Sequence, residues 1–301
     1  MSEESPPPPL DESLYHLSPD EKAFFQKTTG IHDDEELKRH ILDVQKKAYA
    51  IFPYPCIRIL SFLRLTVTEL DGYKQLLKLG RERPDAILLD MACFFGHVFR
   101  KAIVDGFPVQ NVVGSDLHSQ FMDLGHELFR TTPETLPITF IPGDIFDPAH
   151  LDAVPPFTVT HPPTQPRPNL PSHALTSLNP LRGHVSAIHA SAFFHLFTAD
   201  QQRAIAHKVA ALLAPQPGSV IFGDHMGLRA PGFFVNDEAP GWRIFCHSPE
   251  SWAQLWDGEV FEKGTVRVQV DLGPLPFVVS DGAGGLRKTE FTFLRWSVTR
   301  L

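Results

Sequence analysis

The sequence predicts an α/β fold: a mostly parallel, Rossmann-like sheet of seven strands with helices on both faces. From residue 86, apolar runs alternate with segments of helical spacing, and the first three runs each end in aspartate. The last two runs, 265–272 and 289–301, have no helix between them. The alternation implies right-handed crossovers and a parallel sheet, and the final pair implies a C-terminal antiparallel hairpin.

The strands and helices follow from these runs. We expect the first five strands at 86–92, 109–116, 138–144, 185–191 and 218–224. We expect helices between them at 97–106, 119–130 and 198–214. A glycine-rich turn from Asp281 to Gly285 would join the two hairpin strands.

An N-terminal helical cap, residues 18–85, is expected before the sheet domain of residues 86–301. Ser18, Pro19 and Glu21 form a helix-capping pattern, and a second helix over 33–52 has apolar residues three or four apart. Residues 1–17 are polar and proline-rich, so we expect a disordered tail.

Residues 154–183 interrupt the alternation, with eight prolines and no periodicity. A long structureless connection in a compact domain is either functional or disordered. The composition favours a loose surface insertion over a substrate lid. A segment added by a faulty gene model is a further alternative.

Composition excludes several classes of protein. The formal net charge of −8 argues against a nucleic-acid binder and, weakly, against docking on anionic membranes. We expect no signal peptide in the opening residues, which lack a basic start and an apolar core, and we find no apolar run of membrane-spanning length. The three cysteines are far apart and the histidines lack ligand spacing, so we expect no disulfide framework, no metal and a cytoplasmic location.

The segment AILLDMACFFGHVFRKAI, residues 86–103, predicts the start of a nucleotide-cofactor site. Asp90 ends a strand, and Gly96 opens a helix whose N-terminus offers free N–H groups. Asp116 ends the next strand, where a carboxylate can accept both hydroxyls of a ribose, and Asp144 ends the third, within reach of an adenine. A turn role explains any one aspartate equally well. Three in succession favour the site.

Two residues help to choose the cofactor. Ala92 and Phe94 stand where such loops usually carry glycine, and Phe94 would obstruct the close approach of a pyrophosphate. S-adenosylmethionine has no phosphate, and its ammonium and sulfonium suit an acidic strand tip and aromatic walls. A nicotinamide-dependent oxidoreductase is therefore disfavoured, also because a Tyr-x-x-x-Lys pair is absent.

The stretches LLDMACFFG, VVGSDL and GDIFD resemble the first three motifs of class I S-adenosylmethionine-dependent methyltransferases, over roughly residues 86–301 without the insertion. More narrowly, ILDVQKKAYAIFPYPCIRILSFLRL, SDLHSQFMDLGHELF and IHASAFFHLF resemble a fungal group of small-molecule methyltransferases from terpenoid and meroterpenoid pathways, similar to carboxyl O-methyltransferases. The resemblance implies methyl transfer from S-adenosylmethionine to an oxygen of a small apolar acceptor. Ala92 and Phe94 depart from the family's glycines.

The resemblance implies a donor site at the strand ends, closed by the cap. Tyr54 would bond the methionine carboxylate, and residues 189–191 would face the sulfur and methyl. The implied donor-binding residues are Tyr54, Asp90, Ala92, Cys93, Phe94, Gly96, Asp116, Leu117, Asp144, Ile145, Phe146, His189, Ala190 and Ser191.

The acceptor is expected against Phe52, Arg58, Phe193, Phe194 and Trp242. Arg58 would anchor an acidic acceptor, although a solvated arginine is an equal alternative. Phe194 has core packing as an equal alternative. Trp242 and the stretch GFFVN would belong to a lid loop.

His195 and His225 are the candidate general bases, because histidine titrates near neutral pH. A structural role is the commoner alternative for each. A carboxylate acceptor is ionised at neutral pH and needs no base, whereas a phenol or hydroxyl acceptor would need one of the two. A methyltransferase-like regulatory protein remains a rival interpretation, and a homodimer is possible.

Overall fold

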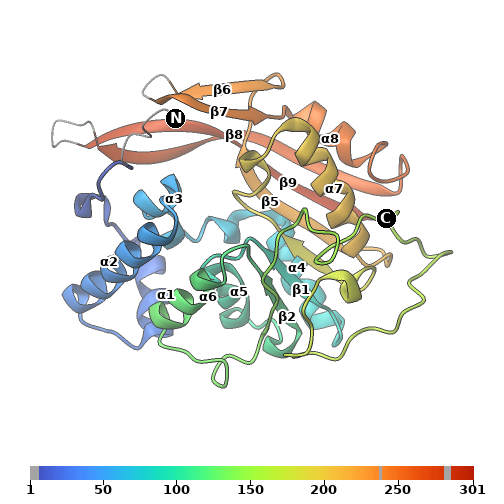
Figure 1. The fold of residues 1–301 in the computed structure, drawn as a ribbon, viewed down its shortest axis with the longest axis horizontal. Coiled ribbons are helices and arrows are strands. Elements are labelled where there is room, and N and C mark those ends of the chain that lie inside the picture. The colour runs from blue at the N-terminus through green and yellow to red at the C-terminus, as the bar shows by residue number, and fades with distance from the viewer. Residues whose placement is uncertain (1–6, 237–238, 281–285) are drawn as a thin grey trace.

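The computed structural model describes residues 7–236, 239–280 and 286–301, and its main feature is a seven-stranded sheet in the order β3-β2-β1-β4-β5-β9-β8 (Figure 1). Strands β1 to β5 are parallel, and β9 is antiparallel to both β5 and β8. The predicted fold class is confirmed, with β8 rather than the antiparallel β9 at the edge. The strands are β1 (Leu88–Met91), β2 (Val112–Ser115), β3 (Thr139–Phe140), β4 (Ala187–His189), β5 (Val220–Met226), β8 (Val266–Ser280) and β9 (Leu286–Arg300).

Helices cover both faces of this sheet because its strands are apolar on both sides. Leu88 packs with the helices of one face and Leu89 with those of the other. The first face carries α4 (Asp71–Glu82), α5 (His97–Val104) and α6 (Ser119–Leu128). The second face carries α7 (Ala199–Leu212) and α8 (Pro249–Trp256). We expected residues 71–82 to belong to the cap, but α4 packs against β5.

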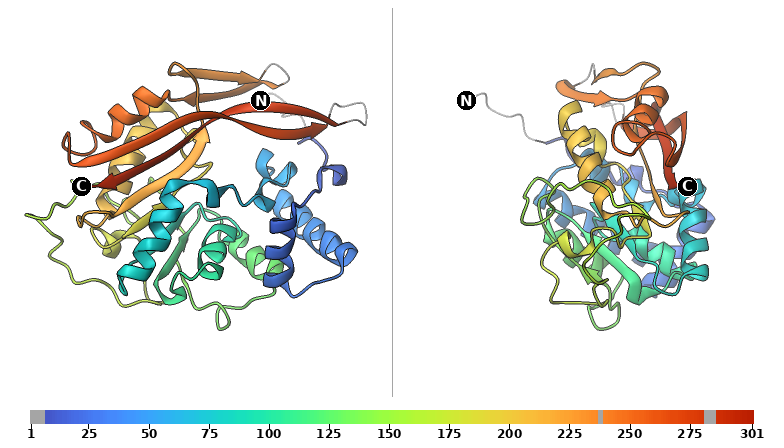
Figure 2. Two further views of the ribbon diagram at one scale, coloured as in Figure 1. Left: turned by 180° about the vertical axis from the view of Figure 1, so that it is seen from behind. Right: turned by 90° about the vertical axis from the view of Figure 1, so that its right-hand side faces the viewer.

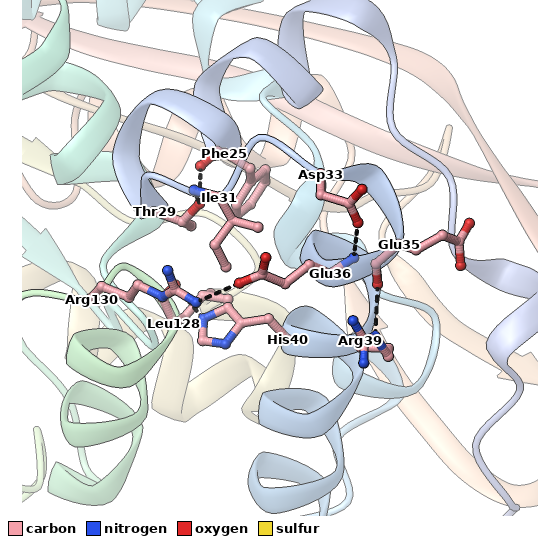
Figure 3. A network of polar contacts seen from close by, with 10 residues as sticks. All are labelled: Phe25, Thr29, Ile31, Asp33, Glu35, Glu36, Arg39, His40, Leu128 and Arg130. Carbon is pink, nitrogen blue, oxygen red and sulfur yellow. Dashed lines mark hydrogen bonds and ion pairs between the residues drawn. The ribbon is translucent and has the colours of Figure 1, made fainter.

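The helical cap consists of α1 (Pro19–Thr29), α2 (Asp34–Ile51) and α3 (Pro55–Arg58). The Ser18–Glu21 capping box predicted for α1 is present. Figure 3 shows how the cap docks on the segment at the end of α6: His40 Nε2 lies 2.9 Å from the Leu128 carbonyl oxygen, and Arg130 pairs with Glu36 at 3.1 Å. These contacts place the cap beside the loops that follow β1 and β2.

The N-terminal tail is ordered where the structure describes it. Residues Glu12–Leu14 form a short 3-10 helix, and the Leu14 side chain is buried in the core of the cap. The Tyr49 hydroxyl donates to the Pro8 carbonyl oxygen at 2.8 Å. The expectation of disorder to residue 17 is therefore wrong for residues 7–17, because burial of Leu14 holds them. Residues 1–6 lie outside the described part.

Residues 154–183, hereafter the strap, run along the amino-terminal edge of the sheet (Figure 2, yellow-green). Arg167 Nε donates to the Asp85 carbonyl oxygen just before β1, and the Ser172 N–H donates to Thr139 Oγ1 at the start of β3. Leu178 is fully buried in the core under α7. The strap is thus neither a loose insertion nor a lid, since bound ligands lie at the opposite, carboxyl-terminal edge.

Helix α8 and the two strands of the segment before it were not predicted. Strands β6 (Gly232–Asn236) and β7 (Ala239–Cys246) form a separate two-stranded sheet beside the β8–β9 hairpin, where we expected a lid loop (Figure 1). Ile244 of β7 packs with Phe293 of β9. Trp242 lies in β7, and its side chain is outside the described part of the structure. The expected turn at 281–285 is also outside the described part. Among the described helices, none has the length and apolarity needed to cross a membrane.

Candidate active site

The loop between β1 and α5 has the backbone of a glycine-rich loop without its glycines. Ala92, Phe94 and Gly96 have φ angles of 50°, 52° and 69°. A left-handed conformation costs a non-glycine residue about 1–2 kcal/mol. At Gly96 a Cβ atom would lie 2.0 Å from the Phe99 ring, so glycine is required there. Strain of this kind persists where the surroundings over-determine the backbone, often at a ligand site.

The Phe94 ring packs against the apolar cluster that includes the core of the cap. Its centroid is 3.7 Å from that of Phe95, 4.6 Å from that of Phe121 on α6 and 6.0 Å from that of Phe62. The Phe94 backbone therefore shapes the loop, while its ring contributes to the aromatic contact with the N-terminal segment.

Asp116, at the end of β2, is buried and held by two backbone donors. Its Oδ2 accepts the Phe94 N–H at 2.9 Å and its Oδ1 accepts the His118 N–H at 3.0 Å. Burial raises the pKa of this carboxyl group, while the two N–H donors act in the opposite direction. An ionised carboxylate has about four acceptor positions, so about two remain for ribose hydroxyls.

Phe52 and Tyr54 lie on the cap side of this carboxylate. Their ring centroids are 4.2 Å apart, and that of Phe52 is 5.8 Å from His118. Burial raises the pKa of Tyr54, and the negative charge of Asp116 adds to the effect, which places the phenol near that carboxylate. Phe52 is 44% exposed, an apolar ring open at the edge of the site.

Asp90, at the end of β1, pairs with His189, at the end of β4. His189 Nδ1 lies 2.6 Å from Asp90 Oδ1, and both side chains are buried. Asp90 Oδ2 is buried with no partner among the described residues, which costs about 1–3 kcal/mol unless a ligand supplies a donor. An orphaned acceptor at a strand tip fits the ammonium group of S-adenosylmethionine.

Several predicted donor residues point elsewhere. The side chains of Cys93, Ile145 and Ala190 are buried in the core, so these positions offer only backbone to a ligand. Asp144 is exposed and accepts the Phe146 N–H within its own turn. Leu117 is 59% exposed, beside Asp116. Cys93, Ile145 and Ala190 therefore stay predicted donor positions through their backbone atoms alone.

Phe193 and Phe194, which were predicted to contact the acceptor, are both buried in the core under the second face of the sheet. Phe193 and Phe197 pack with ring centroids 5.2 Å apart, and Phe146 lies 5.4 Å from Phe197. Phe194 is fully buried, 5.0 Å from Trp252, so its prediction as an acceptor wall is wrong.

Arg58, at the end of α3, was expected to anchor an acidic acceptor. It is half-buried, and its Nε donates to the Pro9 carbonyl oxygen at 3.0 Å. Its guanidinium group therefore ties the tail to the cap in this structure.

Neither His195 nor His225, the two candidate general bases, has an unoccupied Nδ1 lone pair that could take up a proton. His225 is fully buried, and its Nδ1 accepts the Trp296 indole N–H at 2.9 Å. His195 Nδ1 accepts the Met226 backbone N–H at 3.1 Å, and burial lowers the His195 pKa to about 4. A neutral imidazole whose Nδ1 accepts carries its proton on Nε2. His195 is therefore a donor, and the prediction that His225 acts as a base is wrong.

Two polar residues of the site were missed. His97 opens α5, its buried Nδ1 has no partner among the described residues, and burial lowers its pKa to about 4. Asp224, in β5, donates its N–H to Ser191 Oγ at 3.2 Å. Both had a sequence signal: His97 follows the glycine that opens the helix, and Asp224 is a fourth aspartate late in a strand run.

The strand order, the strained β1–α5 loop and the carboxylates at the ends of β1 and β2 define a class I methyltransferase site. A family model described as the meroterpenoid methyltransferase N-terminal domain matches residues 10–63.

Curated relatives match most of the chain. The O-methyltransferase phiE of Fungal sp. (strain ATCC 74256) is 32% identical over 77% of this chain and 68% of its own length. The asnovolin E/chermesin D methyltransferase nvfJ of Aspergillus novofumigatus is 31% identical over 87% of this chain and 81% of its own. The plantazolicin methyltransferase BpumL, solved with S-adenosylhomocysteine, has a TM-score of 0.46 at 14% identity, over 94% of this chain and 96% of its own.

The chain belongs to this family of fungal meroterpenoid-pathway methyltransferases and is an S-adenosylmethionine-dependent enzyme. The interpretation as a non-catalytic regulatory protein finds no support among these relatives.

Proposed function

We propose that this enzyme methylates a carboxylate oxygen of a small apolar natural product, such as a terpenoid or meroterpenoid acid. The donor supplies an activated methyl group that passes directly to the acceptor oxygen. The protein's task is then to align the two molecules and exclude water. No residue has to remove a proton from an acceptor that is already ionised.

On the donor side, the structure supports roles for residues of β1, β2 and the cap. Asp90 Oδ2 has no partner among the described residues and can accept from the ammonium group, and Asp116 keeps acceptor positions for the ribose. The half-buried Tyr54 lies near Asp116 and can close the site from the cap.

The observation that carries the proposal is how His195 and His225 are hydrogen-bonded and buried. The Nδ1 lone pair of each is occupied by an N–H donor, and burial lowers both pKa values. A phenol or hydroxyl acceptor needs a group that takes up a proton. His195 can instead donate its Nε2–H to a carboxylate oxygen, and its ring centroid lies 6.4 Å from that of Phe293.

Replacement of His195 by alanine tests the proposal, with a panel of terpenoid acids and phenols and isotopically labelled donor. For a carboxylate acceptor we expect KM to rise several-fold, because one donor is lost, and kcat to stay within about threefold. A kcat loss of about 10²–10⁴, the usual contribution of a general base, would contradict it and favour a phenol or hydroxyl acceptor. Mass spectrometry of the products identifies the methylated oxygen.

A further inference from the structure

A chain of hydrogen bonds links the carboxyl ends of the three central strands. In β5 the Asp224 N–H donates to Ser191 Oγ at 3.2 Å. Ser191 Oγ lies 2.8 Å from His189 Nε2, and His189 Nδ1 lies 2.6 Å from Asp90 Oδ1. The chain thus runs from β5 through the end of β4 to the tip of β1, beside the expected donor site.

The bond between His189 and Asp90 has one possible direction. A carboxylate only accepts, so the Nδ1–H of His189 must donate to it in either protonation state of the ring. The separation of 2.6 Å is short for an N–H···O hydrogen bond. The side chains of His189 and Asp90 are 4% and 2% exposed, so water does not compete for either atom.

The bond also occupies only one of the two oxygens of the Asp90 carboxylate. Oδ1 is occupied by His189, whereas Oδ2 is buried and has no partner in the described part of the chain. Held at one oxygen, the carboxylate keeps a single rotamer and presents the other oxygen in a fixed direction. Such pre-organisation lowers the entropic cost of binding a ligand.

Ser191 fixes the far side of the imidazole. Its oxygen contacts Nε2 and also accepts from the β5 backbone, which does not move with side-chain rotamers. Four other titratable groups interact with this pair: Asp224, His97 on α5, Cys93 and Asp116.

The order Asp90–His189–Ser191 is also that of a hydrolytic triad, but the surroundings do not suit a nucleophilic serine. Such a serine needs the N–H of the next residue for the oxyanion. Here the Ala192 N–H donates to the Asp224 carbonyl oxygen at 2.7 Å. The arrangement therefore serves to position Asp90.

We propose that His189 and Ser191 are positioning residues, which hold Asp90 through this hydrogen-bond chain so that its Oδ2 atom meets the ammonium group of the methyl donor. The proposal rests on the assignment of Asp90 to that ammonium group. It gives His189 a role through Asp90, in place of the expected direct contact with the donor's sulfur.

Two probes test it by titration calorimetry: S-adenosylhomocysteine, which carries the ammonium group, and 5′-methylthioadenosine, which lacks the whole amino-acid portion. In His189→Asn the amide nitrogen can stand near the Nδ1 position and still donate to Asp90. In His189→Gln it stands near the Nε2 position and loses Asp90. We expect S-adenosylhomocysteine to bind His189→Asn within about threefold of the wild type and His189→Gln at least tenfold more weakly. Ser191→Ala should fall between the two. The affinity for 5′-methylthioadenosine should stay within twofold in all three.

Two results would overturn the proposal. One is equal binding of S-adenosylhomocysteine by the asparagine and glutamine variants. The other is a parallel loss for both probes, which would show general damage to the site. Asp90→Asn is the control for the underlying assignment: if it binds S-adenosylhomocysteine as the wild type does, Asp90 is not the ammonium acceptor. If Asp90→Asn binds S-adenosylhomocysteine weakly while both His189 variants bind it as the wild type does, the positioning role of His189 is refuted. The assignment of Asp90 to the ammonium group then stands.

Discussion

At the scale of single residues, Ala92 and Phe94 have the left-handed backbone of the glycines they replace. Each position carries conformational strain, and only Phe94 gains a large contact in return. The Phe94 ring packs with Phe95 and Phe121, whereas Ala92 adds one methyl group to the core. The strain is therefore offset at one position and largely uncompensated at the other.

This difference predicts opposite effects of glycine at the two positions. Ala92→Gly relieves about 1–2 kcal/mol of strain and costs about 0.5–1 kcal/mol of unfolded-chain entropy, so we expect a net stabilisation of about 0.5–1 kcal/mol. Phe94→Gly loses aromatic packing and should destabilise by about 1–2 kcal/mol despite the relief. Urea unfolding of the two variants measures both values. Equal shifts of the same sign would show that φ strain does not distinguish the two positions.

The low pKa of His195 predicts the pH dependence of turnover. Its pKa is lowered to about 4, so the imidazole is neutral throughout pH 6–8. A carboxylic acid with a pKa of about 4–5 is ionised over the same range. We therefore expect kcat/KM for the acceptor to change less than twofold between pH 6 and 8. A rise of about tenfold per pH unit would instead indicate a phenol acceptor.

At the scale of elements, the strap and the two-stranded β6–β7 sheet lie at opposite edges of the main sheet. The strap contacts the segments at the amino-terminal edge, through Arg167 and Ser172, and contributes Leu178 to the core. The β6–β7 sheet follows β5 at the carboxyl-terminal edge, where Ile244 packs with Met226. The strap supports stability, and the β6–β7 sheet can border the acceptor.

The position of the strap predicts a separation of stability from activity. Leu178→Ala should cost about 2–5 kcal/mol, because it removes a fully buried side chain. The KM values of donor and acceptor should not change at a temperature where the variant is folded, since the site is at the other edge. Val159, 68% exposed in the same segment, is the matched control, and Val159→Ala should change stability by less than about 0.5 kcal/mol. A changed acceptor KM in the Leu178 variant would contradict this placement.

At the scale of the whole molecule, the proposed donor site lies where the cap meets the sheet. Tyr54 comes from the cap, Asp116 from β2 and Asp90 from β1. His40 and Arg130 join the cap to the segment that ends α6. A ligand bound between these parts contacts both and must stabilise the folded chain as a unit.

This coupling predicts a thermal shift. S-adenosylhomocysteine at 100 times its Kd should stabilise the folded enzyme by about 2.7 kcal/mol, a shift of several degrees in Tm. Asp116→Ala should remove most of the shift at the same ligand concentration, because it removes the expected ribose acceptor. An undiminished shift in that variant, measured by scanning calorimetry, would exclude Asp116 from the donor site.

The sequence predicted the positions of strands and helices better than the surroundings of individual side chains. Asp90, Asp116 and the alternation of strands and helices were visible in the sequence, since strand tips and periodicity are local properties. The burial of Phe194 and His225 was not, because it depends on Trp252 and Trp296, which lie far along the chain and give no local signal. The β6–β7 sheet was missed because its strands pair with each other outside the main alternation.

By itself, the sequence determined the fold class and the kind of cofactor, because hydrophobic period and residue type act over a few positions. Only the tertiary structure decided what each polar group does. It packed the Phe94 ring with Phe121, paired His189 with Asp90 across β1 and β4, and occupied the lone pairs of the two candidate bases. Hydrogen-bond partners and burial come from residues distant in the chain, and these set the chemistry of a side chain.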